Sequence, residues 1–200
     1  MATEHSFCSY VVREDTGLAP NPFWGHCTLA VCTPNHQGTR MALGGWICGF
    51  LNKTNGYRFL YAMEVDEVMD LDKYFHDPRF TQKKPNLRGS WQEQCGDNFY
   101  SRGREGQWVQ HRNRFHLGEG MKEQDTRHAR VFIGRRFWYR GRYAAPTPVE
   151  YLPLVGGRGA RVTHDRILVE RFKDWVVSTF EPGVADLPNH KREALNTLAE

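Results

Sequence analysis

The chain has 200 residues, a formal net charge of +4 and an apolar share of 40%. These values favour a single folded domain with a buried core. Aromatic residues make up 13% of the chain, and side chains of that size need burial or a stacking partner. No apolar run approaches the ~20 residues of a membrane-spanning helix, so no membrane partner is expected. The mildly basic balance is compatible with a polyanion partner but too weak to establish one.

The five cysteines, Cys8, Cys27, Cys32, Cys48 and Cys95, lie mostly inside apolar runs. Their odd number, with no signal-peptide pattern before them, predicts reduced and buried thiols in a cytoplasmic protein. In an extended strand Cys27 and Cys32 would point to opposite faces, which argues against a zinc site. We therefore expect neither a metal nor another cofactor.

Short strands dominate the prediction up to residue 160, because the apolar runs are rich in β-branched and aromatic residues. The predicted strands are 7–12, 27–32, 45–51, 58–68, 107–110 and 131–138. Alternation within 58–68 breaks at Val65 and Val68, which predicts a bend or bulge. A short helix at 70–80 would be capped by Asp70 or Asp72.

The rest of the chain divides into an irregular and a helical part. Residues 81–115 have weak periodicity and are predicted to form a long irregular insertion. Residues 165–180 repeat apolar side chains at helical spacing, and Pro182 follows. This helix is expected to pack on the strands, with a homodimer interface as the alternative. The predicted organisation is a binding domain at 1–160 and a helical extension packed on it at 161–200.

An overlong connection between the first two strands is the most unusual stretch. A plain hairpin needs about two residues there, and a longer loop in a compact domain is often functional. The amide of Asn21 can pair with a base edge, and the rings of Phe23 and Trp24 can stack on a base. Alternatively, both rings pack beneath their own loop.

Two further polar groups suit the recognition of a nucleotide. Arg13 can bind a phosphate and Asp15 can orient it, unless they form only a surface ion pair. Asp97 and Asn98, in the turn CGDN, carry donors and acceptors that match a base edge. Alternatively, they bond to their own backbone in an Asx-turn.

The DTRH stretch provides the one candidate for acid–base chemistry. Asp125 could hold His128 in one tautomer and make it a general base, while Arg127 faces a phosphate. Alternatively, Asp125 starts a turn. Arginines interleaved with aromatic residues between positions 88 and 142 also suit a nucleic-acid surface.

Three stretches, GGWICGF at 44–50, LYAMEVDEV at 60–68 and HDPRF at 76–80, resemble the PUA-like barrels of the EVE and YTH branch. A closer resemblance is to the second family of nucleotide modification associated domains. Its motifs match positions 9–13, 15–17, 19–23, 25–30, 45–47, 95–100 and 125–139. Gly45 replaces an aspartate of the family pattern, and His26 replaces a tyrosine.

The resemblance implies an α+β fold, a mostly antiparallel PUA-like (EVE-like) β-barrel with short helices and a C-terminal helix. It also implies a pocket for a modified or flipped base, in prokaryotic or phage systems that modify or restrict bases. We therefore expect recognition of a nucleotide or a modified nucleobase in DNA or RNA, with the base stacked on Trp24 or Trp46. The alternatives are an enzyme that acts on a nucleotide through Asp125 and His128, and a module that binds only protein.

Overall fold

Two stacked sheets organise the computed structural model, which describes residues 4–32, 38–157 and 159–189. The larger sheet has the strand order β1-β3-β4-β9-β10. Its strands are β1 (His5–Val12), β3 (Met41–Leu51), β4 (Phe59–Glu64), β9 (Phe137–Tyr139) and β10 (Gly183–Val184). The pairs β1–β3 and β9–β10 are parallel, whereas β3–β4 and β4–β9 are antiparallel.

The smaller sheet is antiparallel and has the order β2-β8-β5. Its strands are β2 (Cys27–Leu29), β8 (Arg130–Gly134) and β5 (Glu67–Asp70), and a separate hairpin joins β6 (Tyr100–Arg102) to β7 (Trp108–Gln110). The α-helices are α1 (Leu71–His76), α2 (Trp91–Gln94), α3 (Glu119–Thr126) and α4 (Arg166–Thr179). Short 3₁₀ turns occur at Lys53–Asn55, Pro78–Lys83, Gly141–Tyr143 and Val149–Leu154.

The strands of the described residues do not close into a barrel, so the predicted PUA-like barrel is not confirmed, although the α+β class is. The reason is visible in the predicted strand at 58–68. It divides at Val65 and Asp66 into β4 and β5, which belong to different sheets. The predicted bend is therefore real, and it passes the chain from one sheet to the other. The predicted strand at 131–138 divides in the same way into β8 and β9.

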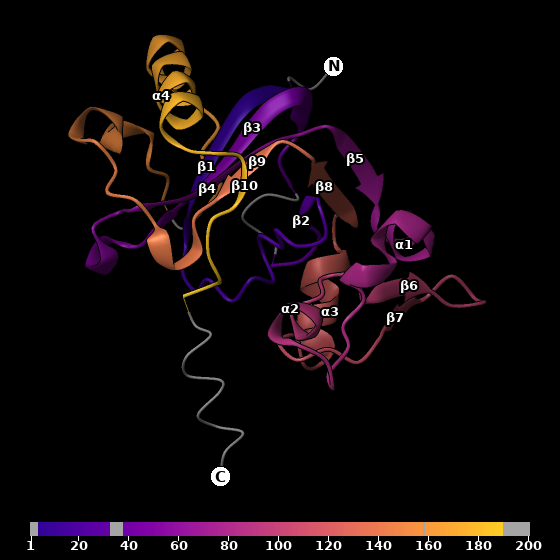
Figure 1. Ribbon diagram of the computed structural model, residues 1–200. Helices are drawn as coiled ribbons and strands as arrows, with labels where there is room; N and C mark the ends of the chain where they lie inside the picture. Colours follow the sequence, from indigo (N-terminus) through magenta and orange to yellow (C-terminus); the bar gives the residue numbers. More distant parts are fainter. Residues whose placement is uncertain (1–3, 33–37, 158, 190–200) are drawn as a thin grey trace.

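Apolar side chains fill both faces of the larger sheet. One face packs against α4 and the turn Val149–Leu154, and the other packs against β2 and β8 of the smaller sheet (Figure 1). A third cluster lies between the smaller sheet and the end of the molecule that carries α1 and β6. Gly49 permits the close packing of β3 on β4, because a Cβ there would lie 2.3 Å from the Tyr61 ring.

The predicted C-terminal helix matches α4 within one residue at each end. Asp165 is its N-cap, and its side chain accepts a hydrogen bond from the Leu168 amide. The buried face consists of Val169, Phe172 and Val176, whereas Ile167 is 74% exposed. The segment after α4 adds β10 to the edge of the larger sheet. None of the helices in the described ranges is long and apolar enough to cross a membrane.

Candidate functional site

The loop between β1 and β2 borders two cavities. The first has a volume of about 540 Å³, and we call it the Trp24 cavity; its lining is Pro22, Phe23, Trp24, Gly25, Gln92, Arg135, Phe137, Pro182, Gly183 and Val184. The second has a volume of about 400 Å³, and we call it the Cys32 cavity; its lining is Tyr10, Val12, Arg13, Glu14, Ala19, Cys32 and Met121.

Trp24 adopts an unusual backbone conformation at the first cavity. Its φ is +62°, in a left-handed region that bulky residues rarely occupy. The ring is half-buried, and its Nε1 has no hydrogen-bond partner among the described residues. Asn21 and Thr28 hold the base of the loop through two backbone hydrogen bonds of 2.9 Å. A tryptophan ring with an unused donor is therefore fixed at the cavity.

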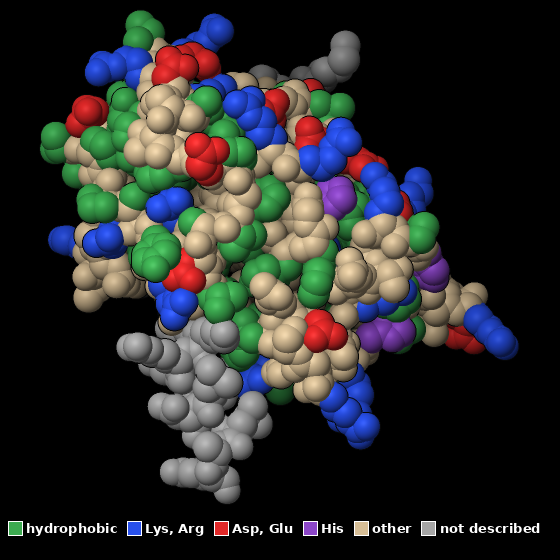
Figure 2. All heavy atoms as spheres, in the orientation of Figure 1, with side chains coloured by type: hydrophobic (Ala, Val, Ile, Leu, Met, Phe, Trp, Pro, Cys, Tyr) green, Lys and Arg blue, Asp and Glu red, His purple; other side chains and the backbone are tan. Residues whose placement is uncertain are grey.

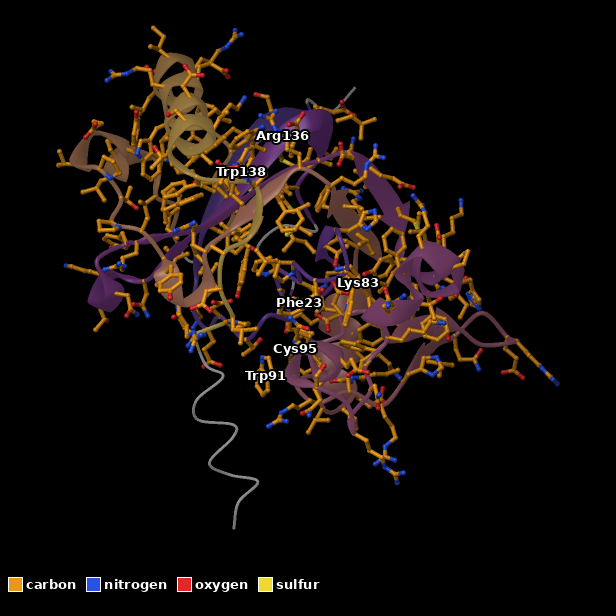
Figure 3. All side chains as sticks on the ribbon, viewed as in Figure 1. Phe23, Lys83, Trp91, Cys95, Arg136 and Trp138 are labelled. Atoms are coloured by element: carbon orange, nitrogen blue, oxygen red, sulfur yellow. The ribbon has the colours of Figure 1, made fainter. Side chains whose placement is uncertain are left out.

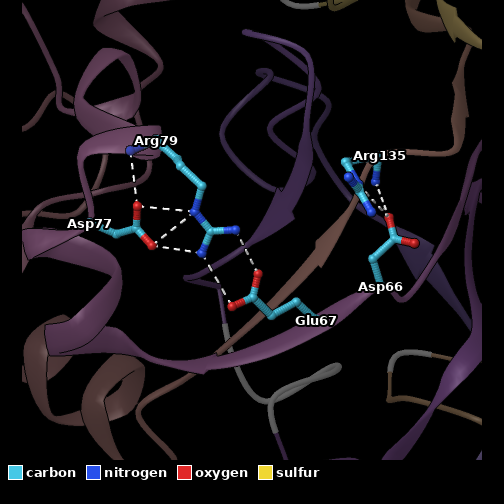
Figure 4. Close-up of polar contacts among 5 residues, drawn as sticks. All are labelled: Asp66, Glu67, Asp77, Arg79 and Arg135. Atoms are coloured by element: carbon cyan, nitrogen blue, oxygen red, sulfur yellow. Dashed lines mark hydrogen bonds and ion pairs between the residues drawn. The ribbon is translucent and has the colours of Figure 1, made fainter.

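Arg135 contributes a positive charge to the same cavity. Its side chain is 76% exposed, and its guanidinium lies 3.9 Å from the Asp66 carboxylate (Figure 4). By contrast, Arg79 in the same view has both sides of its guanidinium occupied by Asp77 and Glu67. Arg135 thus keeps donors that solvent or a ligand can reach.

A buried polar network ties the loop to the turn at residues 95–98. Asn21 Nδ2 donates to the Cys95 carbonyl at 2.8 Å, and Lys83 Nζ donates to Asn21 Oδ1 at 2.7 Å. The Asp97 carboxylate accepts hydrogen bonds of 2.7 Å from Thr28 and Tyr74. Lys83 and Cys95 lie close to the loop that joins β1 and β2, in the region between the sheets and α2 (Figure 3).

Burial sets the ionisation of this network. It lowers the pKa of Lys83 to about 8, against the opposing charge of Asp97. It also raises the pKa of Asp97, while Lys83 and the two hydroxyl donors act in the opposite direction. Each charge therefore compensates the other inside the fold.

Three other predicted binding residues also point into the fold. Asn98 Nδ2 donates to the carbonyls of Tyr74 and Phe80, and Asp15 accepts a 2.6 Å hydrogen bond from Tyr139. Trp46 stacks on Trp138 at a centroid distance of 4.9 Å, within the cluster beneath α4. The ligand roles of these residues stay predictions, and a base could reach them only after a rearrangement.

Asp125, predicted to orient His128, is instead bonded to His116. The Asp125 carboxylate receives a short hydrogen bond from His116 Nδ1, whereas His128 and Arg127 are exposed. His116 was missed because it directly follows the aperiodic segment at 81–115, where no pattern predicts which side chains turn inward. The same carboxylate also accepts hydrogen bonds from the Cys32 amide and the Tyr100 hydroxyl, each at 3.0 Å.

The other imidazole nitrogen faces a thiol. His116 Nε2 lies 3.2 Å from Cys32 Sγ, so Cys32, His116 and Asp125 form a linear chain of contacts. Burial alone would lower the pKa of His116, but its hydrogen bonds to Asp125 and Cys32 raise it to about 10. No group of three or more His, Cys, Asp or Glu side chains within the described ranges is arranged to hold a metal ion.

Residues 4–194 match the family model described as nucleotide modification associated domain 2, and the chain belongs to this family. The family resemblance seen in the sequence is thereby confirmed, whereas the resemblance to PUA-like and EVE-like barrels is not. No significant match was found among curated proteins or among solved structures.

Proposed function

We propose that the chain recognises a nucleotide or a modified nucleobase of DNA or RNA, within a base-modification or defence system of prokaryotes or phages. One observation carries the proposal: the Trp24 cavity combines an aromatic ring, the amide of Gln92 and the guanidinium of Arg135. Its family, whose name refers to nucleotide modification, supplies the context.

Each of these groups matches one part of a nucleotide. A base stacked on an aromatic side chain gains ~1–3 kcal/mol, and Trp24 offers a ring for this contact. Gln92 carries both a donor and an acceptor for a base edge. The Arg135 guanidinium suits a phosphate, which it can bind through two parallel hydrogen bonds. The volume of about 540 Å³ lies in the range of small-molecule sites.

The charge distribution favours recognition of a single nucleotide over contact with a long backbone. On the face shown in Figure 2, Lys and Arg side chains are interspersed with acidic ones rather than gathered into one continuous stripe. Several arginines are also engaged within the fold: Arg102 lies over the Trp108 ring at 3.7 Å, and Arg114 lies over the Trp91 ring at 4.9 Å. Affinity would therefore come mainly from the cavity.

A Trp24→Ala substitution tests this proposal. Loss of the stacking ring should weaken the binding of a mononucleotide or a short oligonucleotide by about 10-fold or more. The matched control is Trp108→Ala, which removes a partly exposed ring that does not line the Trp24 cavity. Calorimetric titration at fixed ionic strength measures both variants, because phosphate contacts depend strongly on salt.

The ligand panel should pair plain and modified bases. A reader of modified bases prefers the modified member of each pair, and Trp24→Ala removes most of that preference. Equal affinity for all members would exclude a reader, and unchanged affinity in Trp24→Ala would exclude this cavity as its site.

A further inference from the structure

We infer that Cys32 is a catalytic nucleophile, activated by His116 and positioned by Asp125, which attacks an acyl carbon of an anionic ligand in the Cys32 cavity. The thiol is half-buried at this cavity. Its sulfur lies 3.2 Å from His116 Nε2, and the opposite nitrogen is bonded to the Asp125 carboxylate. A nucleophile, a base and a group that orients the base are thus in contact in the order that nucleophilic catalysis requires.

The Asp125 carboxylate fixes both ends of this chain. It is fully buried, and besides His116 it binds the backbone amide of Cys32 and the Tyr100 hydroxyl. One side chain therefore sets the orientation of the imidazole and the position of the thiol relative to it. Cys32 also has a φ of +64°, a strained conformation of the kind that occurs frequently at active sites.

The other four cysteines provide an internal comparison. Burial raises the pKa of Cys8 and Cys27 to about 12, and it also raises the pKa of Cys48 and Cys95 well above the usual value. These thiols keep their protons at neutral pH and lie out of the solvent. Cys32 is the half-buried thiol, and its Sγ faces the imidazole of His116.

The lining of the cavity indicates the class of ligand. Val12, Ala19 and Met121 provide apolar walls, Tyr10 also lines the cavity, and exposed Arg13 provides a guanidinium beside the carboxylate of Glu14. Such a site suits a small ligand with an anionic group, and a phosphate fits a guanidinium well. We identify the ligand as a nucleotide with an acyl substituent on an amino group of its base. This identification rests on the ligand class of the proposed function, which assigns its nucleotide to the separate Trp24 cavity, whereas the activation of Cys32 does not rest on it.

The reaction transfers the acyl group to sulfur and then to water. The proton between Cys32 Sγ and His116 Nε2 stays on the imidazole, and the sulfur of Cys32 forms a bond to the acyl carbon. The carbon–nitrogen bond then breaks, and His116 returns the proton to the leaving amino group of the base. Water, deprotonated by His116, attacks the thioester and releases the carboxylic acid and the free thiol. Hydrolysis of one amide bond is the balanced result, and it consumes one water molecule.

Alkylation by iodoacetamide tests the activation without any nucleotide. At mildly acidic pH, where an ordinary thiol is almost fully protonated, Cys32 should react about 10-fold or more faster than a cysteine peptide. Peptide mapping should locate the label on Cys32 alone, and Cys32→Ser should abolish it. A rate equal to that of the peptide would overturn the proposal.

Variants of the two partners separate activation from simple packing. His116→Asn and Asp125→Asn should both remove the acceleration and the ultraviolet absorbance of the thiolate. His128→Asn is the matched control, because it replaces an exposed histidine outside the chain of contacts and should leave both signals. Circular dichroism verifies the fold, and full acceleration in a folded His116→Asn variant would overturn the role of the histidine.

An N-acetylated cytidine monophosphate tests the substrate class. The wild-type chain should release acetate, and an acetyl mass should appear on Cys32 in quenched samples, whereas Cys32→Ser should do neither. If Cys32 is rapidly alkylated but no acetate is released, the acyl-transfer step is wrong although the thiol is activated. The titrations at the Trp24 cavity are independent of this result, so a failure of the proposed function is recognised separately.

Discussion

The side chain of Asn21 was predicted to pair with a base edge, but it forms its hydrogen bonds inside the fold. Its amide has the donor and the acceptor that a base edge requires, but Nδ2 is bonded to the Cys95 carbonyl and Oδ1 to Lys83 Nζ. Lys83 also donates to the carbonyls of Asn21 and His26, at 3.0 and 2.9 Å. All three donors of the ammonium are used, so Lys83 holds the loop in place.

Replacement of Lys83 by methionine should therefore destabilise the chain strongly. The substitution removes the three hydrogen bonds to Asn21 Oδ1 and to the carbonyls of Asn21 and His26, together with the charge that compensates the buried Asp97. Removing one partner of a buried charge pair costs about 3–5 kcal/mol. Urea unfolding followed by tryptophan fluorescence measures the change, with Lys53→Met at an exposed position as the control. Equal stability of the two variants would contradict a structural role for this lysine.

We call Cys32, His116 and Asp125 the thiol site, and the residue types in the sequence identify only part of it. Asp125 stands out because it occurs in a motif with polar neighbours, but its partner was expected three positions away, at His128. The actual partner is His116, nine positions earlier, where the chain lacks periodicity. Cys32 was expected as a reduced, buried thiol like the other cysteines, but it is half-buried. Contacts between segments distant in sequence decide both roles, and residue type alone contains no information about them.

Elements with strong periodicity were predictable, and short ones were not. The helix α4 has 14 residues and a cap, so its apolar repeat and Asp165 define both ends. The helix α2 has only four residues, held by the Ser90–Glu93 capping box and by packing. Segments this short are not stable by themselves. Tertiary contacts select them, which explains why residues 81–115 looked irregular.

The buried face of α4 gives a prediction about this element. Phe172 is fully buried, and its ring lies within 6.0 Å of the rings of Phe7, Phe50 and Phe59. Phe172→Ala should cost about 3–5 kcal/mol, because it removes apolar contacts and leaves a cavity. Ile167→Ala changes the same helix at an exposed position and should cost well below 1 kcal/mol. Thermal unfolding distinguishes the two, and similar losses would mean that α4 does not pack through Phe172.

At the scale of the whole molecule, the bends between β4 and β5 and between β8 and β9 determine the architecture more than the order of the strands does. The sequence resembled a single barrel because its strands occur in a suitable order. The chain instead changes sheet between β4 and β5 and again between β8 and β9. The loop between β1 and β2 lies next to segments from the middle of the chain, through contacts such as those of Asn21 with Cys95 and Lys83. Cys32, which follows β2, and Asp125, in α3, meet through the hydrogen bond from the Cys32 amide, so the fold brings together segments that are distant in sequence.

The charge state of His116 couples this site to global stability. Its pKa of about 10 in the folded chain exceeds the usual 6.5. Below pH 6.5 both states are protonated, and the stabilisation is complete. As the pH rises further, the unfolded state loses this proton first, so the free energy of unfolding falls. Lys83 has a pKa lowered to about 8, so it makes the free energy of unfolding rise with pH, but only above pH 8.

Between pH 6.5 and 8, the pH dependence of the free energy of unfolding therefore reports on His116. Across it the wild-type chain should lose about 2 kcal/mol of stability, at 1.36 kcal/mol for each pH unit. His116→Asn should flatten this slope, because asparagine does not titrate, whereas His128→Asn at an exposed position should preserve it. Urea unfolding at several pH values measures all three chains. Equal slopes in the wild type and His116→Asn would show that His116 is not held as an imidazolium, and this result would weaken the case for a thiolate beside it.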